Sequence, residues 1–148
     1  MATPSEAVSR LRSDRYGVNL SYPAGWDWVP GYDGSRLGGR EGFLQLDAAR
    51  SSDGFIDGVA EQAAYHPLLP YGSQPSIQHL VVGGQSARLI LPSADQPEEM
   101  AGQAQLVVAY PTPLVIAGEA YAFLVVYGDA DHILEIAKSL AFADRLSP

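Results

Sequence analysis

The sequence predicts an α+β domain, in which a mostly antiparallel β-sheet carries two main helices. Three observations lead to this fold class. Several segments alternate apolar and polar residues with a period of two, as half-buried strands do. Residues 53–66 and 129–142 instead space their apolar residues at helical intervals. The strands come in runs that single helices interrupt, which favours an antiparallel sheet over an alternating βαβ order.

The chain has 148 residues, of which 47% are hydrophobic and 18% charged, and this composition fits one packed domain. We expect residues 1–15 to form a flexible or helical N-terminal segment, with a short helix over residues 5–12. Residues 16–148 then form the single α+β domain.

The first half of this domain contains three predicted strands. Residues 16–22 alternate apolar and polar side chains, and residues 26–30 form a short second extended piece. Residues 42–49 alternate again and form the third strand. Between the last two, residues 31–39 contain several glycines and are predicted to be a turn.

The first predicted helix covers residues 53–66, where apolar residues recur at helical spacing. Ser51, Ser52 or Asp53 can accept hydrogen bonds from the free N–H groups of its first turn. Pro67 then ends the helix, because proline has no N–H group to donate to the helix ladder.

Four strands are predicted after this helix. Residues 77–91 form two of them, joined at Gly83 and Gly84, a pair that tolerates the positive φ of a tight hairpin turn. Residues 103–111 and 119–128 are two further β-rich runs. The second of these is apolar on both faces, so we expect a central strand that is covered on both sides.

The last predicted element is an amphipathic helix over residues 129–142. Ile133 and Ile136 begin its apolar stripe, and Asp129 is placed as a natural N-cap. Lys138 lies in the later turns, where the helix dipole favours a cation.

Three segments together resemble the PsbP-like superfamily. They are Tyr-Pro-x-Gly-Trp at 22–26, Gly-Gln-Ser-Ala at 84–87, and a closing helix that ends Ser-Leu-Ala-Phe at 139–142. The likeness covers roughly residues 16–142 and implies an α+β fold with an antiparallel sheet between helices. It also implies a binding or assembly role without shared catalytic residues, in an extracytoplasmic module of a bacterial lipoprotein or membrane-anchored protein.

The charge balance narrows the range of partners. Nine basic residues against 17 acidic ones give a net charge of −8, and the arginines are scattered. A nucleic-acid partner is therefore not expected, because such binding needs clustered lysine and arginine. No run of about 18 apolar residues occurs, so we expect no membrane insertion of this segment.

The N-terminal stretch has no apolar signal core. It therefore fits either a cytoplasmic protein or a domain excised from an exported one. The PsbP-like resemblance favours the extracytoplasmic alternative.

The candidate binding residues lie in one aromatic and arginine-containing stretch. Trp26 is expected in the core, whereas Trp28 is open to either interpretation. We expect Trp28, Tyr32, Arg36 and Arg40 to bind a protein partner or a small anionic or aromatic ligand, because these residue types are enriched at interaction sites. The alternative is a loop that packs on itself, with its arginines paired to neighbouring carboxylates.

No catalytic, metal or cofactor site is predicted. His66, His79 and His132 are too far apart in sequence for zinc-ligand spacing, and the chain has no cysteine. Nucleophile-elbow, HExxH and P-loop motifs are also absent. The first hypothesis is therefore a non-catalytic binding module.

Two alternatives are kept. One is a small hydrolase-like enzyme whose site assembles only in space. The other is a self-associating structural domain that presents residues 105–127 as a free sheet edge.

Overall fold

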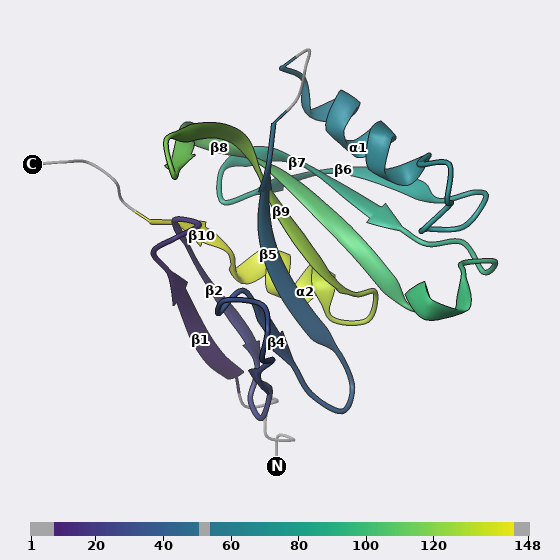
Figure 1. Cartoon of the computed structure of the whole chain (residues 1–148), viewed down its shortest axis with the longest axis horizontal. Coiled ribbons are helices and arrows are strands. Elements are labelled where there is room, and N and C mark those ends of the chain that lie inside the picture. Colours follow the sequence, from purple (N-terminus) through teal and green to yellow (C-terminus); the bar gives the residue numbers. More distant parts are fainter. Residues whose placement is uncertain (1–7, 51–53, 144–148) are drawn as a thin grey trace, which may run out of the picture.

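The protein is described by a computed structural model that covers residues 8–50 and 54–143. Its first elements (Figure 1) are the strands β1 Val8–Ser13, β2 Val18–Pro23, β3 Asp27–Trp28, β4 Arg36–Gly38 and β5 Phe43–Ala49, then the helix α1 Ile56–Ala64. The hairpin β6 Ser76–Val82 and β7 Gln85–Leu91 follows, then the 3-10 turn η1 Glu98–Met100, β8 Gln103–Ile116, β9 Glu119–Asp129, α2 Ile133–Ser139 and β10 Ala141–Phe142.

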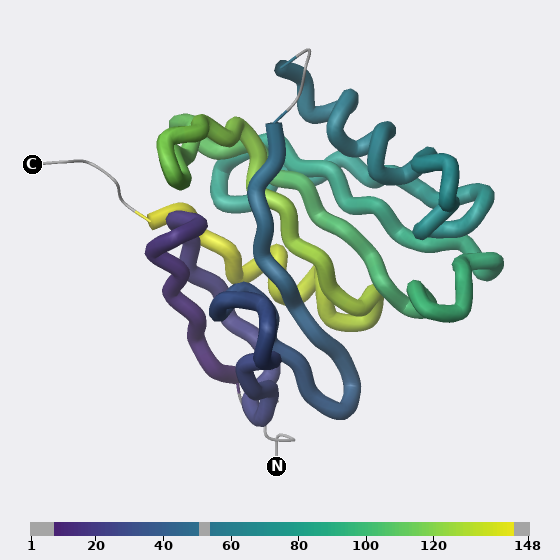
Figure 2. Tube along the Cα trace, viewed as in Figure 1, coloured from purple at the N-terminus to yellow at the C-terminus, as the bar shows by residue number. Residues whose placement is uncertain are grey.

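The strands form two antiparallel sheets. The large sheet has the order β3-β4-β5-β9-β8-β7-β6, and the small sheet has the order β1-β2-β10. In Figure 2 the yellow segment of β10 lies beside the purple N-terminal strands, because β10 pairs with β2, which is far away in the sequence. The structure is therefore α+β as predicted, although sheet dominates and the described helices are two short ones.

The main core lies between the inner face of the large sheet, α2 and the small sheet. Leu106 and Leu124 from the centre of the large sheet are fully buried there, together with Leu20 from β2 and Ile136 from α2. Because side chains alternate along a strand, Phe123 on β9 points to the opposite, outer face. The central strand β9 is thus buried on both faces, as its composition predicts.

Helix α1 covers part of the outer face. Val59 packs on Val107 and Phe123, while Ala60 contacts a second cluster that includes Tyr71. The Tyr71 hydroxyl donates a 2.6 Å hydrogen bond to Gln105 Oε1. Burial raises the pKa of the Tyr71 phenol well above its ordinary value, because the charged phenolate would lose its hydration.

The predicted hairpin at Gly83 and Gly84 is confirmed. Their φ angles are +58° and +80°, the backbone conformation that a two-residue turn of this kind requires. Val82 and Gln85 flank the turn as direct partners, so the turn sets the register of the whole β6–β7 pair.

Three short strands correct the sequence-based expectations. Residues 8–13 form β1 rather than a helical or frayed segment, since Leu11 pairs with Leu20 and enters the core; residues 1–7 lie outside the described part. The turn predicted over residues 31–39 contains β4. Residues 141 and 142 leave the closing helix and form β10. Only β10 pairs with a distant strand, whereas β1 and β4 form hairpins with the strands that follow them; in each case strand pairing outweighs local propensity.

The helix caps also differ from prediction. The residues expected to cap α1, at 51–53, lie outside the described residues, and its N-cap is Phe55, without a side-chain hydrogen bond. The N-cap of α2 is His132 rather than Asp129, because the helix begins only at Ile133. Asp129 instead accepts the His132 N–H at 3.2 Å, within the turn that precedes the helix.

The expected free edge over residues 105–127 is found only in part. Residues 105–108 of β8 lie between β7 and β9, and residues 123–127 of β9 lie between β5 and β8. Residues 109–116 pair only with β9, and residues 119–122 only with β8, among the described strands. The ends of that sheet are β3 and β6. The central parts of both strands are therefore hidden from solvent, whereas the hairpin end is partly exposed, with Val115 at 64%.

Replacing Ile136 with aspartate should destabilise the protein by about 3 kcal/mol or more, because an unpaired carboxylate would enter the main core. Ile136 is 2% exposed, whereas Leu134 on the same helix is 39% exposed. Leu134→Asp is the matched control and should change the free energy of unfolding far less. Urea unfolding followed by circular dichroism measures both, and equal effects would contradict the placement of α2.

Candidate functional site

A partly buried Asp–His pair joins the end of β9 to the start of α2. Asp129 Oδ2 lies 2.6 Å from His132 Nδ1, and the two side chains are 15% and 24% exposed. Asp129 Oδ1 also accepts a 3.0 Å hydrogen bond from the Phe43 N–H at the start of β5. The carboxylate therefore orients the imidazole through Nδ1 and leaves Nε2 as the ring nitrogen available to another group.

The turn between β4 and β5 packs closely against this pair and against Trp26, at two glycines. Gly39 donates a 2.9 Å hydrogen bond to the Gly42 carbonyl, which makes the connection a tight turn. A Cβ atom on Gly42 would collide with Asp129 and would lie 2.8 Å from His132 Nδ1. One on Gly39 would collide with the Trp26 indole. Only glycine at both positions allows the backbone to approach this closely.

Trp26 completes the cluster. Its side chain belongs to the core, as predicted, and it is 8% exposed. The His132 ring meets the indole edge-on, with ring centroids 5.4 Å apart, and Tyr22 stacks on it at 6.3 Å. Such ring pairs stabilise a fixed geometry beyond their buried area. The indole and the imidazole are therefore held before any ligand arrives.

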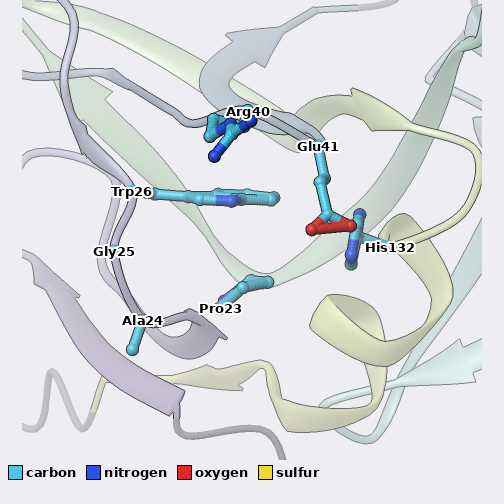
Figure 3. Close-up of a pocket in the computed structure, with 7 residues that line it drawn as sticks. All are labelled: Pro23, Ala24, Gly25, Trp26, Arg40, Glu41 and His132. Atoms are coloured by element: carbon cyan, nitrogen blue, oxygen red, sulfur yellow. The ribbon is translucent and has the colours of Figure 1, made fainter.

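A cavity of about 400 Å³ opens beside this cluster, between the β2–β3 turn and the β4–β5 turn. Figure 3 shows Arg40 on one side of the indole and Pro23 on the other, with the Glu41 carboxylate extending toward His132. The lining residues are Pro23, Ala24, Gly25, Trp26, Arg40, Glu41 and His132. The cavity thus offers a flat apolar ring, a guanidinium, a carboxylate and an imidazole.

The predicted binding residues are divided between two sides of the β4–β5 turn. Arg40 lines the Trp26 cavity, whereas Tyr32 and Arg36 line an outer cavity of about 600 Å³. The Arg36 guanidinium lies 5.1 Å from the Tyr32 ring centroid and 4.3 Å from that of Phe43. It also donates a 2.9 Å hydrogen bond to Gln45 Oε1.

Trp28 does not join either of these groups. It pairs with Leu37 at the end of the large sheet, and it is 50% exposed. Arg36 is thus engaged as the self-packing interpretation expects, though its partners are rings and an amide rather than carboxylates. The four predicted residues do not converge on one cavity.

Sequence reasoning missed Trp26, Asp129 and His132 as cavity residues. The Asp-x-x-His spacing at 129–132 also fits the first turn of a helix, so it does not by itself indicate a site. No local pattern links Asp129 to Phe43 or to Trp26, which lie far away in sequence. A usable signal was the Gly39-x-x-Gly42 spacing, because two glycines that flank two charged residues suggest a close backbone approach.

Within residues 8–50 and 54–143, no three His, Asp or Glu side chains converge as a metal site requires. Asp129 and His132 contribute two such groups that already bond to each other. Neither of the described helices is long and apolar enough to cross a membrane.

Comparison with known proteins gives one solved structure to report. No family model matches the chain, and no curated protein is similar to it in sequence. The chain is similar in structure to cyanobacterial PsbP (CyanoP) from Synechocystis sp. PCC 6803, with a TM-score of 0.46 and 12% identity over 96% of this chain and 97% of that one. At such identity this likeness carries nothing about a ligand or partner.

Gly42→Ala should lower the free energy of unfolding by about 1–3 kcal/mol, because the new methyl group would push Asp129 and His132 apart. Gly38→Ala is the matched control, since a Cβ atom there meets only ordinary contacts of 3.5 Å or more. Its effect should stay within about 0.5 kcal/mol. Chemical denaturation of both variants checks the close packing at the turn, and a neutral Gly42→Ala would contradict it.

Proposed function

We propose that this chain is a non-catalytic binding module whose ligand site is the Trp26 cavity. The observation that carries the proposal is the pre-organised cluster of Trp26, His132 and Asp129 beside an uncommitted guanidinium. Among the described residues, no ion pair engages Arg40, whereas Arg50 and Arg88 both pair with carboxylates. A cationic group held unpaired at a cavity mouth favours an anionic ligand group.

The ligand class follows from the lining. A planar guanidinium matches a carboxylate with two parallel hydrogen bonds. The indole beside it suits a flat apolar body, and Nε2 of His132 can donate to or accept from a further polar atom. We infer that the ligand is a small carboxylate with an aromatic or similarly flat body. Glu41 at the same mouth disfavours ligands that carry a second negative charge there.

An NMR titration with benzoate as probe tests this site. The two tryptophans lie in different places, so their two indole N–H signals report on the cavity and on the sheet end separately. We expect the Trp26 signal to shift on addition of benzoate and the Trp28 signal to stay. Trp28→Phe assigns the two signals.

Variants at Arg40 test whether its guanidinium binds the carboxylate of benzoate. Arg40→Ala should abolish the shift, and Arg40→Lys should weaken it, because lysine keeps the charge but loses the bidentate fork. Arg12→Ala changes the net charge equally on an exposed residue paired with Asp14 and should leave the shift intact. A saturating series of aromatic carboxylates without any Trp26 shift contradicts the proposed site.

The outer surface of Trp28, Tyr32 and Arg36 remains a second proposed site for a protein partner or an aromatic ligand. Its support is the exposure of Trp28 and Tyr32, which are 50% and 40% exposed. In the same titration a shift of the Trp28 signal alone would favour this surface over the Trp26 cavity.

A small hydrolase-like enzyme is the second candidate function, favoured by the orientation of His132. A carboxylate on Nδ1 and a free Nε2 is the arrangement of a general base. The cavity lining contains no serine, threonine or cysteine, so the base would have to activate water. Activated aryl esters test this alternative. It is established if the protein hydrolyses them, His132→Gln abolishes the hydrolysis and Arg12→Ala retains it. Equal hydrolysis rates in the two variants would reject it.

We further propose an extracytoplasmic location, with a cytoplasmic one as the alternative. The PsbP-like resemblance supports this proposal, and the cavity fits either place.

A further inference from the structure

Strand β6 leaves one edge of the large sheet open. It pairs with β7 on one side and ends the sheet on the other. In the part of the chain that the structure describes, no backbone hydrogen bond from another segment reaches its outer side. Residues 76–82 include no lysine, arginine, carboxylate or proline, the residues with which proteins commonly protect an edge strand.

The register of the hairpin determines which backbone groups face outward. Val82 and Gln85 flank a two-residue turn, so they form a hydrogen-bonded pair within the β6–β7 ladder. Hydrogen-bonded and non-bonded pairs alternate along antiparallel strands. The N–H and C=O groups of Ile77, His79 and Val81 therefore point away from β7, toward the open edge.

We propose that a second copy of this chain pairs with β6 in an antiparallel register about a two-fold axis at His79. In this register His79 lies opposite His79 of the second copy, and Ile77 lies opposite Val81 of the second copy. The outward backbone groups of these residues then meet their counterparts as hydrogen-bonded pairs. The two large sheets become one continuous sheet.

The side chains of β6 suit a copy of itself. Ile77 and Val81 point to the same face, and β-branched residues that lie opposite each other stabilise a strand pair. Val81 is 77% exposed in the single chain, so this contact would remove an apolar side chain from water. Ile77, Leu80 and Val82 already pack in the single chain, so Val81 is the apolar side chain of β6 that gains burial only in the pair.

Charge distinguishes this edge from that of strand β1. The chain carries a net charge of −8, so association through charged surfaces would be opposed by repulsion. Strand β6 brings no like charges together. Strand β1, an edge of the small sheet, carries Arg10 and Arg12, which would oppose arginines of a second copy.

One strand pair is a small interface, so the dimer is reversible and depends on concentration. The Trp26 cavity lies toward the β3 end of the large sheet, and β6 forms the opposite end. Pairing through β6 would therefore leave both ligand cavities open, and this inference does not rest on the proposed ligand.

Single cysteine variants test the register directly, because the chain has no cysteine of its own. In the proposed pair the Cα atoms of the two His79 residues lie about 5.5 Å apart, within disulfide reach. His79→Cys should give a covalent dimer on mild oxidation. Val81→Cys alone should not, since each Val81 faces Ile77. A mixture of Ile77→Cys and Val81→Cys should give the mixed dimer.

Light scattering over a range of concentrations tests the pairing without cysteine. The parent mass should rise toward that of a dimer as the concentration increases. Val81→Lys should stay monomeric at the same concentrations, because lysine fits this exposed position in the folded single chain but opposes pairing with a second strand. Thermal melts confirm that the variants stay folded. A parent that is monomeric at millimolar concentration, or equal cross-linking of His79→Cys and Val81→Cys, overturns the proposal and leaves the edge to a strand of another protein.

Discussion

The Asp129 carboxylate is the constraint on which the candidate site depends. One oxygen accepts from the Phe43 N–H and the other lies against the imidazole of His132, so a single side chain ties β5, β9 and the start of α2 together. Because both oxygens have partners, the partly buried charge is not left unsatisfied, and charge-assisted hydrogen bonds of this kind are the strong ones. Trp26 then has a fixed surface to pack on.

This anchoring works because β9 itself is rigid. Leu124 and Val126 face the main core, while Phe123 faces outward against Val59 of α1, and all three are buried. A strand covered on both faces has little freedom to shift, so the position of Asp129, its last residue, is fixed. The cavity consequently lies beside the end of this strand, toward the β3 end of the sheet, and is lined by turns. Binding loops on a fixed frame are a common arrangement.

The two ends of the large sheet differ in chemistry. At the β3 end, short strands and glycine turns fold over the edge and create the Trp26 cavity. At the β6 end, a seven-residue strand without charges keeps its outward backbone groups open. The first end suits a small ligand because its polar groups converge. The second suits an extended chain because its donors and acceptors repeat along a line.

The sequence by itself determined the features that neighbouring residues decide together. The alternation of β2, the two-glycine turn of β6 and β7, and the apolar stripe with Ile136 all follow from local period and backbone preference. The strands β4 and β10 escaped prediction because each has only two or three residues, and β10 also depends on the distant β2 for its hydrogen bonds. Strand β1 was missed because its sequence also fits a helix, and its pairing with β2 decides between the two. Only the tertiary structure placed Arg40 beside Trp26 and Arg36 on the other side of the same turn, since the path of a glycine turn over a partly buried Asp–His pair is decided by contacts between segments far apart in the chain.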